Sequence, residues 1–195
     1  MKKRKLKKSV KRKLFFLLFI IAMVYVAFHQ GNAPKDTVIE PSIPKEYVPI
    51  YKAAEKEYGV PWQLLAAHHR VETKFSTMES MISPAGAEGP MQFMPCTFVG
   101  WSHPTCSDLG KGNISSKDKV NPAIIKKYGG YGVDANGDGK ADPFDLEDAV
   151  FSAAAYLKAH GAADGQLKKA IYSYNHSEQY VDDVLHYFYA YTSKE

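Results

Sequence analysis

The chain has 195 residues, of which 45% are hydrophobic and 24% charged, with a formal net charge of +4. The first 13 residues contain nine of the 25 Lys and Arg and no acidic residue, so the remainder carries 16 basic against 21 acidic residues. That acidic balance argues against nucleic acid as a partner, because phosphate binding needs a basic face rather than a basic tail.

An uncharged, apolar run from Leu14 to Phe28 directly follows the basic tail of residues 1–13. As a helix it spans roughly 22 Å, and snorkelling lysines and the uncharged residues beyond it extend that length toward the roughly 30 Å of a bilayer core. We therefore expect residues 14–30 to form a single-pass transmembrane signal anchor. The positive-inside rule places everything after it outside the cytoplasm.

A cleaved signal peptide is the alternative, because Gly31-Asn-Ala33 offers small residues at the spacing of a cleavage site, and cleavage would release a secreted protein. Pro34 directly after that site is expected to impede the cut. Residues 31–44 contain three prolines among polar residues, which predicts an extended linker. Residues 45–195 then suit one domain with an ordinary core.

The domain is predicted to be mainly α-helical. Apolar residues at helical spacing predict helices over 46–58, ended by Gly59, and from Pro61 to about residue 75. Gly, Pro and Ser predict turns and a small hairpin over 76–90, a short helix is expected over 91–101, and 102–121 reads as loop. Three further helices are expected over 146–160, 166–172 and 178–191.

Glu72 and the Gly-rich run that follows it are the first candidates for chemistry. A carboxyl group at a helix end, facing a Gly-rich turn and large soft side chains, is well placed to keep its proton near neutral pH. Such an acid protonates a glycosidic oxygen. Taken alone, however, a Glu on a helix is most often a solvated surface residue.

Four separated blocks resemble, in order, the lytic transglycosylases of the lysozyme-like superfamily. They are Val71-Glu-Thr-Lys-Phe75, Ser83-Pro-Ala-Gly86, Gly89-Pro-Met-Gln-Phe-Met-Pro95 and Tyr174-Asn-His-Ser177. The resemblance runs from about Tyr47 to Tyr187 and is closest to the membrane-bound branch that carries an EF-hand-like calcium loop. It implies an α+β lysozyme-like fold and an SLT-type domain acting on peptidoglycan.

The resemblance also implies roles for individual residues. Glu72 matches the catalytic acid, and Ser83 and Gln92 match groups that contact the substrate. Met91 and Phe93 match residues that form the cleft. The substrate-binding set is completed by two residues that would face the glutamate from the other side, Tyr174 and Asn175.

A single carboxylate suffices if the substrate supplies the remaining groups, as the resemblance implies. The expected reaction cleaves the MurNAc–GlcNAc β-1,4 bond and leaves a 1,6-anhydroMurNAc end, with Glu72 as acid and then base. Two alternatives stay open, a hydrolytic muramidase and a non-catalytic wall-binding scaffold. Glu88, standing where a small residue is usual, is either a second carboxylate that raises the pKa of Glu72 or acts as a base, or a solvated turn residue.

An Asp-rich run from Asp134 to Asp145 fits the oxygen-ligand spacing of an EF-hand and predicts a structural Ca²⁺, with no cofactor expected for catalysis. The closing carboxylate is either Asp145, which would otherwise cap the next helix, or Asp148, as in the longer loop of the related enzymes. The alternative for the whole run is a charged turn without metal. The candidate ligands are Asp134, Asn136, Asp138, Lys140, Asp142, Asp145 and Asp148.

Three further points concern the helix of Glu72 and the cysteines. His68, His69 and Glu72 lack the completed spacing of a zinc protease, so we expect the histidines to pack and form hydrogen bonds. Cys96 and Cys106 lie in the exported part, where a disulfide is permitted, but their spacing alone leaves open whether they are bonded. Protein partners, oligomeric state and physiological role do not follow from the sequence.

Overall fold

The structure is a computed structural model and describes residues 42–193. Helices α2 and α3 are the first elements in this part of the chain. The predicted basic tail, the segment 14–30 and the linker up to residue 41 lie outside the described residues. Between residues 42 and 193, no helix is long and apolar enough to cross a membrane. The compact unit described below begins at Ser42.

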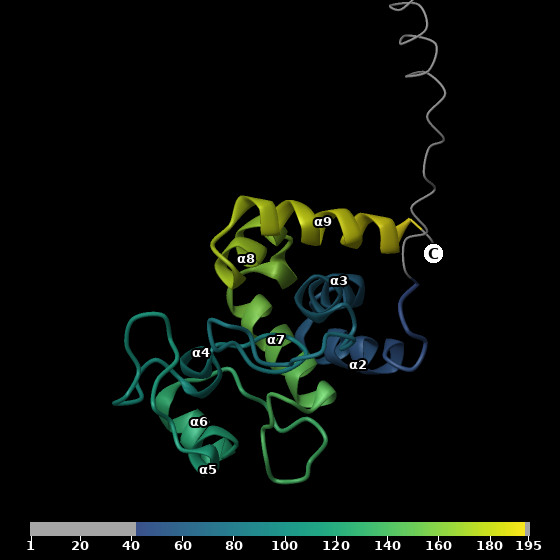
Figure 1. Cartoon of the computed structure of the whole chain (residues 1–195). Coiled ribbons are helices and arrows are strands. Elements are labelled where there is room, and N and C mark those ends of the chain that lie inside the picture. The colour runs from purple at the N-terminus through teal and green to yellow at the C-terminus, as the bar shows by residue number, and fades with distance from the viewer. Residues whose placement is uncertain (1–41, 194–195) are drawn as a thin grey trace, which may run out of the picture. The chain divides into compact units, whose positions relative to one another are not determined.

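The first two predicted helices are confirmed. Helix α2 spans Val48–Tyr58 and ends at Gly59, which has the left-handed conformation expected of a glycine C-cap. Helix α3 spans Trp62–Thr73, and Pro61 precedes it as the N-cap residue. Because α3 is buried over most of its length, it forms the centre of the domain, between α9 and α2 in Figure 1.

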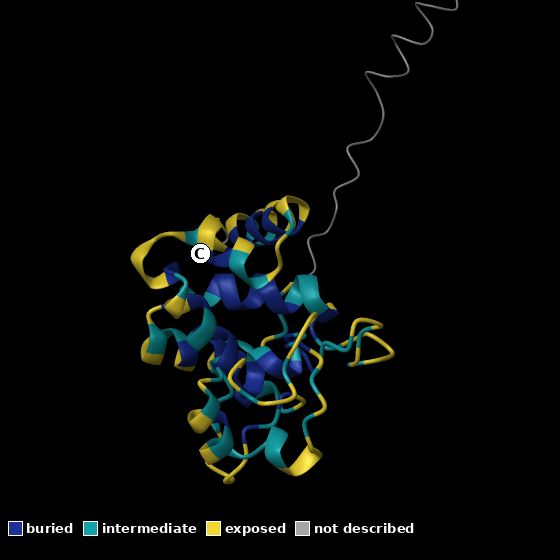
Figure 2. Cartoon of the chain, turned by 90° about the vertical axis from the view of Figure 1, so that its left-hand side faces the viewer, coloured by how far each residue is buried: buried dark blue, intermediate teal, exposed yellow. Residues whose placement is uncertain are grey.

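The three predicted C-terminal helices are also present. Helix α7 spans Leu146–Ala159, α8 spans Leu167–Tyr174 and α9 spans Glu178–Thr192, with a short 3₁₀ turn, η1, over Ala162–Asp164. Asp145 caps α7 and Ser177 caps α9 through side-chain oxygens that accept backbone N–H groups. Helix α9 packs against α3 along its apolar face, and the buried residues, dark blue in Figure 2, are concentrated in the helices.

The segment between α3 and α7 is where the predictions were least accurate. The expected helix over 91–101 is confined to α4, Pro95–Val99. The stretch read as loop contains α5, Ser116–Lys119, and α6 follows over Pro122–Tyr128. Both helices are short, and each begins at a side-chain cap, Ser115 or Asn121. Neither has a periodic apolar stripe long enough to predict it from the sequence.

The predicted hairpin region has very little β-structure. In the described chain it is reduced to two isolated antiparallel bridges, Ile82 with Glu88 and Glu88 with Phe93. The domain is therefore mainly helical, as expected. Its bridged turn lies between the end of α3 and α4 and brings the Gly-rich run beside Glu72.

Candidate active site

The carboxyl group of Glu72 lies in the last turn of α3 and is held by a tyrosine of α9. The hydroxyl of Tyr180 donates a hydrogen bond to Glu72 Oε1 over 2.5 Å. Burial raises the pKa of Glu72 from 4.5 to about 7, against the opposing effect of this hydrogen bond, which favours the ionised form. Near neutral pH the group is therefore balanced between its acid and base forms, as a residue that first donates and then accepts a proton requires.

Aromatic side chains surround this carboxyl group. The rings of Tyr174 and Tyr180 are parallel, with centroids 6.5 Å apart, and the His68 ring lies 4.9 Å from that of Tyr174. Burial raises the pKa of both tyrosines far above the usual value, and the charge of Glu72 adds to the effect, so both hydroxyls stay protonated. Glu72 is thus surrounded by neutral aromatic side chains, of which Tyr180 donates a hydrogen bond to it.

The backbone reverses direction directly after Glu72. Lys74, Phe75 and Ser76 all have positive φ, an uncommon conformation for residues other than glycine. Thr73 holds the reversal, because its buried hydroxyl donates to the carbonyl of Pro90 over 2.8 Å and accepts from the backbone N–H of Ser76 over 3.1 Å. The hydroxyl of Thr73 therefore joins the end of α3 to the Gly-rich run.

Two open cavities lie beside the Gly-rich run, and Gln92 lines both of them. The first, of about 360 Å³, is bounded by the Gly-rich run, α4 and the loop after it, α7, and the end of α8. It is lined by Gln92, Phe93, Met94, Thr97, Trp101, Asp108, Leu109, Tyr156, Ser173, Tyr174 and His176. The second, of about 670 Å³, is lined by Lys74, Thr77, Met78, Glu79, Ser80, Ile82, Ser83, Pro84 and Gln92. Glu72 lines neither cavity, but its neighbours Tyr174 and Lys74 each line one.

The predicted substrate-binding residues divide into two groups. Phe93 and Tyr174 line the first cavity, Ser83 the second and Gln92 both. The amide of Gln92 donates to the carbonyls of Gly89 and Met81, which holds the bridged turn together.

The other two members of the predicted set are placed differently. Met91 is fully buried and contributes its backbone, since its carbonyl accepts the hydroxyl of Tyr174 over 2.8 Å. Asn175 is exposed after the end of α8 and lines neither cavity.

Glu88 is engaged away from Glu72. Its Oε1 forms an ion pair of 2.6 Å with Lys119 Nζ, and its side chain is only 12% exposed. Glu88 is not among the groups that shift the pKa of Glu72. The interpretations of Glu88 as a solvated turn residue and as a source of the raised pKa are therefore both wrong, because the α5 lysine draws its carboxylate into an ion pair.

The two histidines of α3 form hydrogen bonds, as expected. His69 Nδ1 lies 2.7 Å from the Tyr51 hydroxyl and its Nε2 lies 2.8 Å from Ser76 Oγ. Burial lowers the pKa of His69 to about 4, so the ring is neutral near pH 7. His69, on α3, therefore links α2 to the backbone reversal that follows Glu72.

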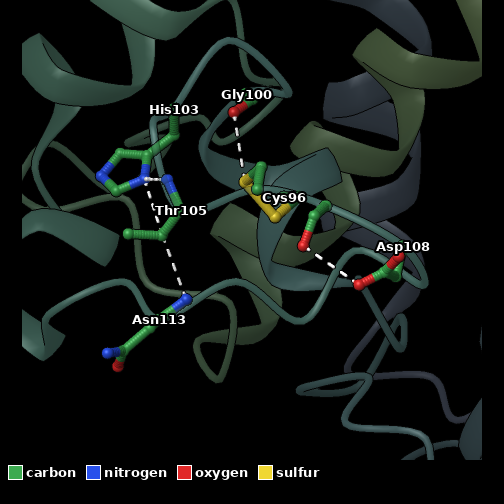
Figure 3. Close-up of a disulfide and its surroundings, with 8 residues drawn as sticks. Cys96, Gly100, His103, Thr105, Asp108 and Asn113 are labelled. Carbon is green, nitrogen blue, oxygen red and sulfur yellow. Dashed lines mark hydrogen bonds between the residues drawn. A yellow bond between two sulfur atoms is a disulfide. The ribbon is translucent and has the colours of Figure 1, made fainter.

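Cys96 and Cys106 form a disulfide, with their Cα atoms 5.7 Å apart (Figure 3). The segment after the disulfide loop is fastened to it, because the N–H of Cys96 donates to the carbonyl of Gly110 over 2.9 Å. Thr105 Oγ1 contacts His103 within the loop and accepts the N–H of Asn113 from the segment that follows. The exposed side chains of Trp101, in the loop, and Leu109, after it, line the first cavity.

Loss of this disulfide is expected to destabilise the domain by about 3 kcal/mol, the chain-entropy value for a loop of this length. Urea denaturation with and without a reducing agent measures the difference. The Cys96→Ala/Cys106→Ala variant is the control, because its unfolding midpoint should equal that of the reduced wild type and should not respond to reductant. An unchanged wild-type midpoint on reduction would contradict this expectation.

The Asp-rich loop is organised by hydrogen bonds from its own backbone. Asp134 accepts the N–H groups of Gly137 and Gly139 on its two oxygens, and the side chains of Asn136 and Asp138 each accept one loop N–H. In residues 42–193 no three or more His, Cys, Asp or Glu side chains are grouped closely enough to hold a metal ion.

The two candidate closing carboxylates have different positions. Asp145 Oδ1 accepts the N–H groups of Glu147 and Asp148 and so caps α7. Asp148 is fully buried, and its carboxylate accepts N–H groups from Ala135, Asn136 and Asp142 across the loop. Asp148, one turn into α7, is therefore the carboxylate that points into the loop.

The sequence did not indicate that several further residues belong to this site. Tyr180 lies in the helix expected over 178–191, and only the packing of α9 on α3 shows that its hydroxyl reaches Glu72. Leu109 and Lys119 lie in the stretch read as loop, and Trp101 lies at the end of the short helix expected over 91–101. Their aromatic, apolar or charged character is the only sequence signal, and it does not indicate which surface they reach.

Comparisons with known proteins point to peptidoglycan. Residues 124–168 match the family model of the transglycosylase SLT domain, a segment from α6 into α8 that includes the Asp-rich loop but not Glu72. A curated relative, the L-Ala–D-Glu endopeptidase of Bacillus subtilis (strain 168), is 26% identical over 166 residues, covering 85% of this chain and 47% of the relative. The chain thus spans about half the length of that relative. No solved structure matches the chain significantly. The SLT-domain match supports a peptidoglycan-acting enzyme of the lysozyme-like superfamily.

Proposed function

We propose that the chain is a lytic transglycosylase that cleaves the MurNAc–GlcNAc β-1,4 bond of peptidoglycan glycan strands. The observation that carries this proposal is the state of Glu72, a buried carboxyl group with a pKa of about 7 that accepts the neutral hydroxyl of Tyr180. An acid with that pKa keeps its proton when a glycosidic oxygen approaches at neutral pH. Tyr174, beside Glu72, lines one cavity and Lys74, two residues after it, lines the other, an arrangement that suits an elongated polymer.

The proposed reaction needs only one protein carboxylate. Glu72 donates its proton to the glycosidic oxygen as the bond from that oxygen to the anomeric carbon breaks. The N-acetyl oxygen of the same sugar stabilises the cationic anomeric carbon. The sugar's 6-hydroxyl oxygen then bonds to that carbon and releases its proton to Glu72, so the enzyme returns to its starting state with no water added. The engagement of Glu88 by Lys119 supports a single-carboxylate mechanism over a two-carboxylate one.

Mass spectrometry of digested cell wall tests the proposal directly. The expected product is glycan with 1,6-anhydroMurNAc ends, which borohydride does not reduce. Reducible MurNAc ends would instead show hydrolysis by a muramidase. New amino termini at L-Ala–D-Glu linkages would show the activity that the Bacillus subtilis relative is named for, and unchanged wall with retained binding would show a scaffold.

We also infer that this domain works outside the cytoplasm, held at the membrane by residues 14–30 or released after cleavage. Peptidoglycan lies outside the cytoplasmic membrane. Disulfides such as Cys96–Cys106 form and persist in oxidising compartments, which agrees with that location. Fractionation of cells with an antibody to the domain separates the two forms. An anchored protein stays with membranes at its full 21.8 kDa, whereas a secreted one appears shortened in the medium.

We further propose that the Asp-rich loop binds a structural Ca²⁺, with Asp148 rather than Asp145 closing the site. The side-chain oxygens at loop positions one, three, five and nine, from Asp134, Asn136, Asp138 and Asp142, are the donors that Ca²⁺ prefers. The placement of the Asp148 carboxylate inside the loop supports its role as the closing ligand.

Calcium binding should raise the melting temperature, and EGTA should reverse the rise. The Asp145→Asn variant should keep this response, because Asn caps a helix as well as Asp does. The Asp148→Asn variant should lose it. A response lost in Asp145→Asn but kept in Asp148→Asn would reverse the assignment, and no response in the wild type would contradict calcium binding.

A further inference from the structure

The fully buried His68 contacts Tyr180, the tyrosine that donates a hydrogen bond to Glu72. His68 lies one turn before Glu72 on the same side of α3, and its Nδ1 is 2.9 Å from the hydroxyl oxygen of Tyr180. The same hydroxyl contacts Glu72 Oε1 over 2.5 Å. His68, Tyr180 and Glu72 therefore form a continuous hydrogen-bonded chain between α3 and α9.

The direction of the hydrogen bonds in this chain follows from the burial of His68. Burial lowers its pKa to about 3, so the ring is neutral and has one N–H donor and one acceptor nitrogen. Nε2 is buried and has no hydrogen-bond partner among the described residues. A buried N–H without an acceptor is a rare and costly arrangement, so the proton lies on Nδ1.

A proton on Nδ1 determines what the other two groups do. His68 donates to the oxygen of Tyr180, and the hydroxyl hydrogen of Tyr180 is then directed to Glu72 Oε1. Because Oε1 accepts that hydrogen, the proton of the neutral carboxyl group is placed on the other oxygen, Oε2.

We propose that His68 is a positioning residue that acts through Tyr180 to keep the transferable proton of Glu72 on Oε2, the oxygen that Tyr180 does not contact. This inference rests on the proposed function. Without the His68 donor, Tyr180 is able to accept a proton from Glu72 Oε1 instead. The acid would then be held in the wrong orientation, with its proton directed into the protein.

The titratable groups that act on Glu72 are few. Tyr180 donates to it, Tyr174 feels its charge, and His68 reaches it through Tyr180. Arg70, Asp183 and His186 line a separate cavity, Lys74 lines both that cavity and the one that contains Ser83, and Glu88 pairs with Lys119. The response of Glu72 to a change at His68 therefore reports on this chain.

Two variants of His68 separate positioning from packing. His68→Leu fills the space without a donor, whereas His68→Asn places an amide N–H near the position of Nδ1. We expect His68→Leu to lower kcat roughly 10- to 100-fold, the size of effect that misplacing a reacting group produces, with little change in KM. His68→Asn should recover most of that loss. Its alkaline limb of activity should match the wild type, while that of His68→Leu moves to higher pH.

A readout that does not need catalysis distinguishes this inference from the proposed function. The carboxyl carbon of Glu72, labelled with ¹³C, reports its titration midpoint by NMR in the full chain. The midpoint should rise in His68→Leu, stay near the wild-type value in His68→Asn, and rise in Tyr180→Phe, which removes the hydroxyl that stabilises the carboxylate.

The Tyr180→Phe background provides the decisive control. Since His68 acts only through the hydroxyl, adding His68→Leu to Tyr180→Phe should change the midpoint no further. An unchanged midpoint in Tyr180→Phe, or an equal additional rise in the double variant, would overturn the inference. If His68→Leu does not fold, the ¹⁵N chemical shifts of the His68 ring in the wild type decide it, because they report which ring nitrogen carries the proton, and a proton on Nε2 would overturn the inference. A wild type that releases no glycan product would overturn the proposed function alone.

Discussion

Replacing Glu72 by Gln is expected to lower the cleavage of isolated cell-wall glycan by roughly 1,000-fold or more, within the range that a general acid contributes. The amide has nearly the shape of the carboxyl group and still accepts the hydroxyl of Tyr180. It cannot donate a proton to a leaving oxygen or take one from the 6-hydroxyl. Initial rates of soluble product release, normalised to folded protein, measure the loss.

The same substitution should not unfold the protein. The pKa of Glu72 is raised in the folded state, so between about pH 4.5 and 7 the folded chain binds a proton that the unfolded chain releases. Stability contributed by this group therefore falls as the pH rises through that window. Glu72→Gln removes this penalty, and its melting temperature at pH 8 should equal or exceed that of the wild type.

Glu88→Gln is the matched control, since it makes the same chemical change at the other carboxylate near the Gly-rich run. Its amide oxygen still accepts Lys119, so we expect activity within a few-fold of the wild type. Equal losses in the two variants would favour a two-carboxylate muramidase. Full activity in Glu72→Gln would contradict the proposed role of Glu72 altogether.

The pH dependence of the wild type follows from the same group. The acid form of Glu72 starts the reaction, so kcat/KM should fall as the pH rises through about 7.

The helices that surround the site were predictable, because each has a regular apolar stripe and a recognisable end. Gly59 after α2 and the stripe of α9 are examples. The resemblance of the block around Glu72 then indicated this residue as the candidate acid. The residues that determine the state of that acid were not accessible, because the contact of Tyr180 with Glu72 joins residues 108 positions apart. Such contacts depend on how helices pack, which local patterns do not specify.

The same distinction explains the errors between residues 91 and 133. This stretch is stabilised by caps, a disulfide and close backbone approaches rather than by an amphipathic face. The sequence contains the capping residues and the cysteines. Their pairing becomes evident only when the loop closes, and so the wall formed by Trp101 and Leu109 was missed.

Replacing Gly89 by Ala is expected to destabilise the domain by about 2–5 kcal/mol, a large part of the stability of a domain of this size. Gly89 has a φ of +77°, and a Cβ atom there would lie 1.7 Å from the carbonyl oxygen of Pro143. That oxygen belongs to the backbone near the end of the Asp-rich loop, so it cannot move aside as a flexible side chain does. The Gly-rich run and that backbone must separate to admit the methyl group.

Gly129→Ala is the control for the backbone conformation alone, because Gly129 has a φ of +73° and no atom within 4 Å of the added Cβ. It should cost only about 1–2 kcal/mol, the penalty of a left-handed Ala. Urea unfolding of both variants measures the difference. Gly89 also accepts the amide of Gln92, so Gly89→Ala should lose glycan cleavage even below its unfolding transition, whereas Gly129→Ala should retain it. Equal destabilisation by the two substitutions would show that the Gly-rich run does not pack against Pro143.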